Sequence, residues 1–342
     1  MDDQLLGVID ATSYATGMED LMHHRSLAAV PIAGRYRMID FILSSMVNSG
    51  VNSVAIFPKY QYRSLMDHLG SGRNWDLNRK RDGLFFFPSP QLDDSKKRVG
   101  AFQHFQAHID YFKRSRQTYV IIANCFTLAS IDFRPILSWH MNHDCDITDI
   151  RKDGKSLEMY IIKRELLMDL VERSEETGFM YMKDVVTSLK HNYSVCLYEY
   201  QGRAHMLNSI ETFYEQSMDL LKPEIFQQVF RSDFPVYTKV KDEPPTQYTR
   251  GSKASQSLIA NGCTIAGTVD SSILFRAVTV GENSKVESSI IMQKSLVGNH
   301  CHLSHCILDK DVHVEDGTVL IGTKEEPIVL KKGTRQKAVN VS

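Results

Sequence analysis

The sequence lacks three features that would quickly assign it to a broad class: an excess of one charge, a long apolar run and closely spaced cysteine pairs. It has 40 Lys and Arg against 41 Asp and Glu, so no net positive charge draws its surface to nucleic acid or to an anionic membrane. No apolar stretch approaches the ~20 residues of a membrane-spanning helix, and the start MDDQLLGVID is acidic, unlike a signal peptide. We therefore expect a cytoplasmic protein that binds neither nucleic acid nor membrane.

Recognisable patterns of metal ligands are also scarce. The six cysteines have no CxxC spacing, which predicts reduced thiols in a reducing compartment; they are Cys125, Cys145, Cys196, Cys263, Cys301 and Cys306. The segment NHCHLSHC at 299–306 holds three histidines and two cysteines. It lies in a repeat whose side chains point to different faces, so these groups are not expected to converge on one ion. We predict no metal site.

The length of the chain and its pattern predict two domains. A chain of 342 residues exceeds what one hydrophobic core usually serves. Over residues 1–235, β-branched runs such as LLGVID and TYVIIAN alternate with helical stretches such as MIDFILSSMVNSG. This alternation is typical of an α/β fold with a parallel sheet covered by helices. Residues 236–255, which include Pro244 and Pro245, are interpreted as a linker.

The last quarter of the chain contains a repeat. Aliphatic residues recur at six-residue steps within 256–330, as in Ile259 and Ile265 or Val280 and Val286. One such step is typical of one side of a triangular coil, so the period predicts a left-handed parallel β-helix. A β-sandwich stays open as an alternative on periodicity alone. Residues 331–342 are expected to form a C-terminal tail.

One segment is specific enough to indicate a family. AVPIAGRYRMIDFILSSMVNSG at 29–50 resembles the bacterial glucose-1-phosphate adenylyltransferases (ADP-glucose pyrophosphorylases), whose equivalent segment is close to KPAVPFGGKYRLIDFxLSNxxNSG. PPTQY at 244–248 is similar to the family's PPAKF. The resemblance implies a dinucleotide-binding, Rossmann-like nucleotidyltransferase domain followed by the β-helix, in a tetrameric assembly. It also implies the family's reaction, in which ATP and glucose 1-phosphate form ADP-glucose and pyrophosphate for glycogen synthesis.

The family's nucleotide loop, AGGxGxRLxxLTxxRAKP, has lost its characteristic residues in this chain. When the loop is aligned from PIAGRYR, its glycines fall on Thr12, Ser13 and Ala15, while its arginine falls on Gly17 and its substrate-contacting lysine on Leu27. Glycines let the backbone approach phosphate closely, and a Cβ atom obstructs that approach. The resemblance therefore implies a degenerate nucleotide loop.

The two metal-binding aspartates of the family are replaced as well. Alignment of GDHxYxxDY with ANCFTLASIDF places Phe126 at the first aspartate, and counting back from SMDLL places Met206 at the second, that of YWRDVGT. Neither side chain ligates magnesium. Much of the family's sugar-binding segment is missing between DITDIRKDG and SLEMYIIKRELL. We expect no catalytic residues and no cofactor, with Mg²⁺ and ATP bound only by a catalytic partner.

These losses together are the pattern of the noncatalytic companion subunit that some bacteria pair with an active enzyme of the family. The resemblance thus implies a regulatory subunit that forms a hetero-tetramer with a catalytic subunit, and homo-oligomers when isolated. Two enzymatic alternatives stay open. One is a weakly active adenylyltransferase that uses relocated groups among Asp10, Asp144, Asp146 and Asp149. The other is an acyltransferase that uses a histidine of the β-helix.

Basic residues between 23 and 37 form the last candidate site, which consists of His24, Arg25, Arg35 and Arg37. In catalytic relatives, the positions matching Arg25 and Arg37 help to form an anionic effector pocket between the two domains. The resemblance therefore implies a site for a phosphorylated effector, and guanidinium groups suit phosphate because they present paired N–H donors. A solvated basic face, or a pair between Arg37 and Asp40, is the alternative.

Overall fold

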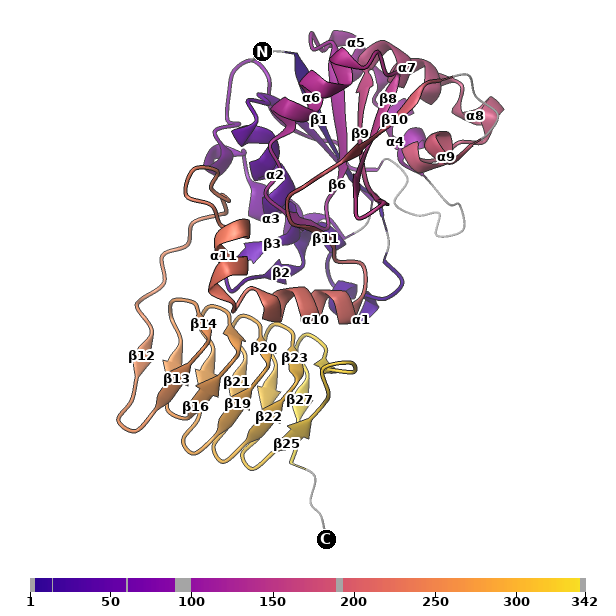
Figure 1. The fold of residues 1–342 in the computed structure, drawn as a ribbon. Coiled ribbons are helices and arrows are strands. Elements are labelled where there is room, and N and C mark those ends of the chain that lie inside the picture. Colours follow the sequence, from indigo (N-terminus) through magenta and orange to yellow (C-terminus); the bar gives the residue numbers. More distant parts are fainter. Residues whose placement is uncertain (1–3, 14, 60, 90–99, 189–192, 339–342) are drawn as a thin grey trace.

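The first domain is built on a seven-stranded sheet (Figure 1). A computed structural model describes residues 4–13, 15–59, 61–89, 100–188 and 193–338. The strand order is β10-β8-β9-β6-β1-β4-β5, and all neighbours are parallel except β9, which runs antiparallel to β6 and β8. The strands are β1 (Leu5–Ala11), β4 (Ser53–Pro58), β5 (Gly83–Phe86), β6 (Tyr119–Asn124), β8 (Ile147–Lys152), β9 (Lys155–Lys163) and β10 (Val195–Glu199).

Helices cover both faces of this sheet, which explains why its central strands are apolar runs without alternation. In β1, Leu5 and Ile9 belong to the core on one face, whereas Leu6 and Val8 belong to the core on the other. The first face is covered by α2 (Met38–Asn48) and α6 (Phe133–Asn142), and α10 (Ile210–Asp219) lies between this part of the core and the second domain. The second is covered by α4 (Ala101–Gln106), α5 (Ile109–Arg114), α7 (Arg164–Glu172) and α9 (Met182–Thr187). The predicted α/β domain is confirmed.

Short elements connect these layers. They are α1 (Glu19–Met22), α3 (Arg63–Leu69), α8 (Ser174–Thr177), α11 (Pro223–Val229), the 3₁₀ turns Leu27–Ala29 and Arg73–Trp75, and the small strands β2 (Pro31–Ile32), β3 (Tyr36–Arg37), β7 (Thr127–Ala129) and β11 (Ala204–Met206). Helix α2 begins at Arg37, whose backbone N–H donates to the carboxylate of Asp40 over 2.9 Å. It ends before Gly50, whose φ of 84° is the left-handed conformation expected after a helix.

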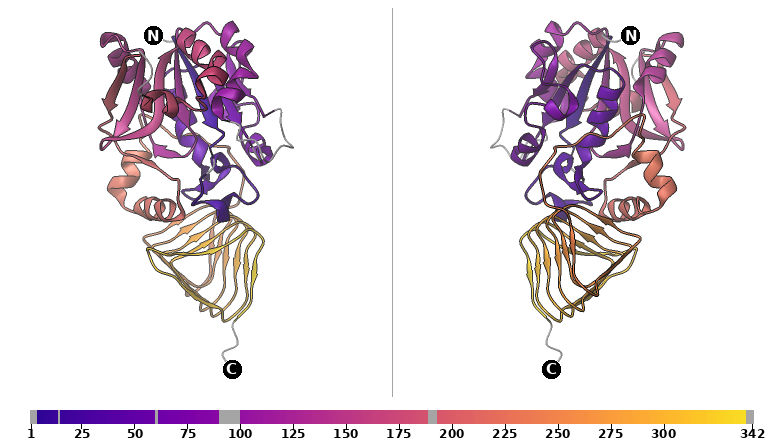
Figure 2. Two further views of the ribbon diagram at one scale, coloured as in Figure 1. Left: turned by 90° about the vertical axis from the view of Figure 1, so that its right-hand side faces the viewer. Right: turned by 90° about the vertical axis from the view of Figure 1, so that its left-hand side faces the viewer.

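The second domain is a left-handed parallel β-helix, as predicted, and its triangular cross-section is clear in Figure 2. Its first side is the sheet β12 (Gln247–Tyr248), β15 (Thr264–Ile265), β18 (Thr279–Val280), β21 (Leu296–Val297), β24 (His313–Val314) and β27 (Arg335–Gln336). Its second side is β13 (Lys253–Ser255), β16 (Thr268–Asp270), β19 (Lys285–Glu287), β22 (His302–Ser304) and β25 (Val319–Ile321). Its third side is β14 (Leu258–Ile259), β17 (Ile273–Leu274), β20 (Ile290–Ile291), β23 (Cys306–Leu308) and β26 (Ile328–Leu330).

The β-helix strands extend beyond the repeat visible in the sequence. Strands β12 and β13 lie within the expected linker 236–255, and β27 lies within the expected tail 331–342. These outer coils lack the aliphatic column that forms the core, because their ends have no further coil to cover them. Tyr248, for example, is in register with the buried Ile265 but is 53% exposed.

The third side of the β-helix packs on the first domain. Along each strand of this side, residues that point into the β-helix core, such as Leu274 and Ile291, alternate with residues that point outward. On this side the outward residues include Ile273, Ile290 and Ile307, which join the core of the first domain. Helix α10 rests on this side (Figure 1), and the hydroxyl of Tyr214 donates to the carbonyl of Ser288 over 2.5 Å. The two domains therefore share one continuous apolar core.

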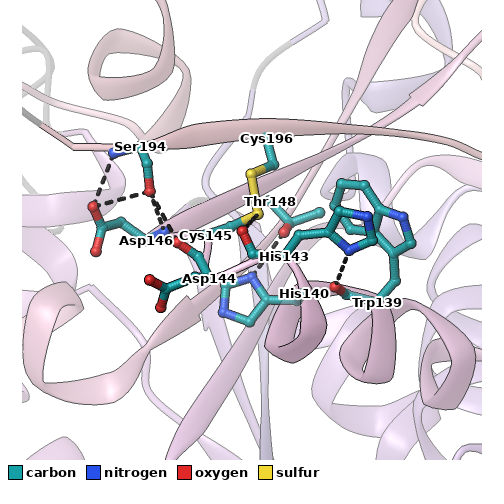
Figure 3. Close-up of a disulfide and its surroundings, with 9 residues drawn as sticks. All are labelled: Trp139, His140, His143, Asp144, Cys145, Asp146, Thr148, Ser194 and Cys196. Atoms are coloured by element: carbon teal, nitrogen blue, oxygen red, sulfur yellow. Dashed lines mark hydrogen bonds between the residues drawn. A yellow bond between two sulfur atoms is a disulfide. The ribbon is translucent and has the colours of Figure 1, made fainter.

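The expectation of six reduced thiols is wrong for one pair. Cys145 and Cys196 form a disulfide, shown in Figure 3, that links the turn before β8 to the neighbouring strand β10. The remaining four cysteines are buried free thiols. In the part of the chain that the structure describes, no helix is long and apolar enough to cross a membrane.

Candidate functional site

A cavity of about 510 Å³ opens at the carboxyl ends of β1 and β6. Its lining includes Asp10, Thr12, Ser13, Ala15 and Phe126. Ligand sites of open α/β sheets lie at this end of the strands. The structure thus brings the expected degenerate loop and the first expected metal position into one pocket.

The loop uses its own polar groups to hold its conformation. Oδ1 of Asp10 accepts hydrogen bonds from the backbone N–H of Thr12 at 2.9 Å and from its hydroxyl at 2.6 Å. Asp10 is half-buried at the wall of the cavity, and its removal from water raises the pKa of its carboxyl while the bonds from Thr12 oppose that rise. An amide that could have faced a phosphate is therefore bound to an acidic side chain, which disfavours a polyanion at this place.

The end of the loop is fixed to helix α10. Gly17 forms a parallel bridge with Ser209, and the N–H of Ile210 donates to the carbonyl of Gly17 over 2.8 Å. A Cβ atom on Gly17 would lie 3.0 Å from the Cβ of Ser209, so a larger residue here would require Ser209 to shift by a few tenths of an ångström. Leu27, where the family has a lysine, is 1% exposed within the apolar core. Both positions now serve packing.

The two expected metal positions are neighbours in space. Phe126 directly precedes β7, and Met206 ends β11, which pairs with β7 so that Met206 lies opposite Thr127. The N–H of Leu207 donates to the carbonyl of Phe126 over 2.9 Å. Their side chains differ in surroundings: the 5% exposed phenyl ring of Phe126 lines the cavity, whereas the thioether of Met206 packs against the apolar core. Neither is a ligand for magnesium.

Other groupings of metal ligands are absent from the residues that the structure describes: no three His, Cys, Asp or Glu side chains are placed to hold an ion. Within 299–306, Cys301 and Cys306 point into the β-helix core, whereas His302 contacts Glu287 on the second side at 3.0 Å. The cysteine and histidine side chains therefore point in different directions from the coil and do not meet at one ion.

The carboxylates considered as relocated catalytic groups do not converge. Asp10 lies at the carboxyl end of β1, whereas Asp144 and Asp146 precede the amino end of the parallel strand β8. Asp146 accepts bonds from the backbone N–H and the hydroxyl of Ser194 at 2.8 and 3.2 Å. Asp149 is buried within β8 and accepts from the hydroxyl of Ser156 at 2.5 Å, and burial raises the pKa of its carboxyl.

The basic candidates divide into two groups at the boundary between the domains. Arg25 is 3% exposed and makes a bidentate ion pair with Asp309 of the β-helix, with N···O distances of 2.8 and 3.0 Å. Both ends of the Arg25 guanidinium are therefore used in a contact between the domains, while its expected role at an anionic effector site stays a prediction. His24 is exposed, with its ring 4.6 Å from that of His23.

Arg35 and Arg37 belong to a cationic cluster. Nη1 of Arg37 donates to the carbonyl and the hydroxyl of Ser64 at 2.7 and 2.8 Å. Burial, followed by repulsion from Arg25 and Arg276, lowers the pKa of Arg37 to about 10, although Asp40 opposes this. Arg35 lines a second cavity of about 500 Å³ at the domain boundary.

Four further cations that the sequence did not single out belong to this cluster. Lys239, Lys241 and Arg276 line the same cavity as Arg35. Burial lowers the pKa of Lys241 and of Arg276, and both groups are also repelled by other cations. Burial and repulsion from Arg37 and Arg25 lower the pKa of Lys310 to about 7. The alternation of lysines in YTKVKD was a signal, but it lay in a segment interpreted only as a linker.

Comparisons with known proteins agree with this architecture. Residues 7–156 match the family model described as nucleotidyl transferase, and residues 243–327 match that described as GlmU-like, C-terminal hexapeptide. The chain is 56% identical to the glycogen biosynthesis protein GlgD of Geobacillus stearothermophilus over 99% of both chains, and 49% identical to that of Bacillus subtilis (strain 168) over 98% of both. It is 28% identical to the glucose-1-phosphate adenylyltransferase of Bacillus anthracis, over 85% of this chain and 88% of the relative.

Proposed function

Because the chain belongs to the GlgD family of glycogen biosynthesis proteins, which is related to the glucose-1-phosphate adenylyltransferases, we propose that it is a noncatalytic regulatory subunit. In this proposal it forms a hetero-tetramer with a catalytic glucose-1-phosphate adenylyltransferase in the cytoplasm. It modulates the synthesis of ADP-glucose from ATP and glucose 1-phosphate, while Mg²⁺ and ATP bind in the partner.

The observation that carries the noncatalytic role is that apolar side chains, Phe126 and Met206, stand at both expected metal positions on the paired segments β7 and β11. Phosphoryl transfer depends on cations that neutralise charge and on groups that position the phosphates. Here the two expected metal positions offer no carboxylates to bind a magnesium ion, and the backbone N–H of Thr12 donates to Asp10 and not to a phosphate. The site therefore lacks both the charge neutralisation and the phosphate contacts that lower the barrier.

The cationic cluster at the domain boundary supports a regulatory role for a phosphorylated effector. Arg35, Lys239, Lys241 and Arg276 surround one cavity, with Lys310 held close to other cations nearby. Among the charged groups that act on Lys241 and Arg276, Glu243 is the attractive one. Cations that repel one another bind a multiply charged anion favourably, because the anion relieves the repulsion that the fold imposes.

An effect on the partner requires contacts that differ between the partner's active and inactive states. The apolar core shared by the two domains supports this, because a ligand at their boundary contacts a single packed body and not a flexible joint. The isolated chain forms homo-oligomers in this proposal, since the same surfaces are available to a second copy.

The proposal is tested by measuring ADP-glucose synthesis for this chain alone, for the catalytic subunit alone and for the two mixed. We expect no turnover from this chain, and a mixture that co-elutes in gel filtration and exceeds the rate of the catalytic subunit. Magnesium-dependent turnover by the purified chain alone would establish the weakly active alternative instead. An unchanged rate together with separate elution would refute the regulatory role.

Effector binding is tested separately by calorimetry with fructose 1,6-bisphosphate, AMP and pyruvate. We expect Arg276→Ala to abolish the heat of the ligand that binds, while co-elution with the partner is preserved. Arg231→Ala is the matched control, since Arg231 is an exposed arginine paired with Asp233 at 2.6 Å on the first domain. Absence of heat with all three compounds would refute the effector site. The proposed hetero-oligomer would not be affected by that result, because it is tested by the rate assay and by co-elution.

A further inference from the structure

One covalent link in the first domain is not used by the proposed function. Cys145 lies in the turn before β8, and Cys196 lies in β10, which forms an edge of the seven-stranded sheet. The two residues are 51 positions apart, and Figure 3 shows their disulfide spanning the two strands. Both strands belong to the first domain, apart from the β-helix (Figure 1).

The other cysteines do not share this position. Cys125, Cys263, Cys301 and Cys306 are 0 to 2% exposed in apolar cores. Burial raises the pKa of each of these thiols, to about 11 for Cys306. A buried thiol that stays protonated reacts slowly with disulfides and electrophiles. Cys196, by contrast, lies on a partly exposed strand.

Strand β10 has few other attachments. It pairs only with β8, over five residue pairs from Val195 to Glu199, and its outer edge has no partner strand within the described chain. None of its residues is fully buried, and Leu197 is 54% exposed. Just before the strand, Ser194 bonds to Asp146 through its backbone N–H and its hydroxyl. With so little apolar burial, the disulfide is a major restraint on this edge.

We propose that Cys145 and Cys196 form a reversible thiol–disulfide exchange site whose substrate class is a dithiol reductant, and whose oxidation state sets how firmly β10 is held to β8. The reductant's thiolate attacks Sγ of Cys196, the more accessible sulfur, and the sulfur of Cys145 leaves and takes up a proton. The second thiol of the reductant then resolves the mixed disulfide and releases Cys196. Two electrons pass to the protein, which gains two thiols, and the reductant leaves as a disulfide.

The structural consequence is local. Segment α9 precedes β10 in the chain and supplies Met182 and Lys183 to the lining of the nucleotide-type cavity. Release of β10 loosens the anchor that follows α9, whereas the domain boundary and its cationic cluster lie on other elements. Reduction should therefore change the sheet edge and leave the effector cavity intact, so this proposal stands or fails independently of the regulatory function.

The test begins with the unmodified full-length protein, purified with thiols blocked at lysis by N-ethylmaleimide. Peptide mass mapping without reductant should give one linked pair containing Cys145 and Cys196. After native incubation with dithiothreitol, and separately with a reduced thioredoxin, both residues should become labelled while Cys301 stays unlabelled. Addition of oxidised glutathione after removal of the reductant should restore the link.

Hydrogen exchange then reports on the strand itself. Reduction should speed amide exchange in Val195–Glu199 by about tenfold or more, because the edge opens locally, while Leu5–Ala11 in the sheet centre should not change. A Cys145→Ser variant should exchange like the reduced protein and no longer respond to the reductant, with Cys301→Ser as the matched control. Absence of the linked peptide, failure of the link to re-form, or equal exchange in both states would overturn the proposal.

Discussion

Replacement of Arg25 tests how the two domains are held together. The guanidinium of Arg25 meets both carboxylate oxygens of Asp309 at 2.8 and 3.0 Å, and both side chains are 3% exposed. Arg25 also donates to the carbonyl of Leu21 over 3.2 Å. In Arg25→Met the aliphatic volume is largely kept, but Asp309 stays buried without its counter-charge. Removing one partner of such a pair costs about 3–5 kcal/mol.

A double-mutant cycle separates the pair from other effects of each substitution. The single variants Arg25→Met and Asp309→Leu should each lower the free energy of unfolding in urea by about 3–5 kcal/mol. The double variant should recover much of that loss, because neither charge remains buried alone. The control is Arg231→Met, at an exposed pair with Asp233, which should cost no more than about 1 kcal/mol. If both single variants lose less than about 1 kcal/mol of unfolding free energy, the hypothesis that Arg25 and Asp309 form a buried stabilising ion pair is refuted.

Three further perturbations have defined outcomes. Burial lowers the pKa of Lys310 from 10.5 to about 7. Between pH 7 and 10.5 the unfolded chain therefore binds more protons than the folded protein, so the free energy of unfolding should rise with pH over this range. Urea midpoints measured over this range should show that Lys310→Met loses the pH dependence. Burial lowers the pKa of His140 to about 4, so stability should fall as pH drops from 6.5 toward 4, and His140→Asn should flatten that fall. Phe126→Asp combined with Met206→Asp should give no magnesium-dependent turnover and should lower the thermal midpoint, since it buries charge in the core; turnover would contradict the role assigned to the loop.

The features that could be predicted from the sequence are those that leave a local pattern. LLGVID is apolar at every position that meets one of two helical layers, and the six-residue period follows the sides of the β-helix coil. The proximity of Phe126 and Met206 was implied by the family alignment alone, and the pairing of β7 with β11 places the two residues together. Recognition of the family thus located the cavity at the carboxyl ends of β1 and β6.

The features that could not be predicted depend on contacts between distant parts of the chain. Arg25 and Asp309 are 284 positions apart, and Cys145 and Cys196 are 51 apart. Neither separation leaves a periodic signal, because each pair is created by the packing of whole elements. The first and last coils of the β-helix were missed for a different reason: they lack a neighbouring coil on one side, so their inward positions need not be aliphatic.

The degenerate loop and the domain boundary are mechanically connected, and this explains why a loop without phosphate contacts keeps a defined conformation. Its end is bridged to the first turn of α10 through Gly17 and Ser209. The same helix rests on the β-helix, where Tyr214 bonds to the carbonyl of Ser288. A substitution that disturbs the loop must therefore also displace the helix that joins the domains. The loop therefore has a structural role, in which the glycine at position 17, where the family has an arginine, makes a close backbone contact with Ser209 at the start of α10.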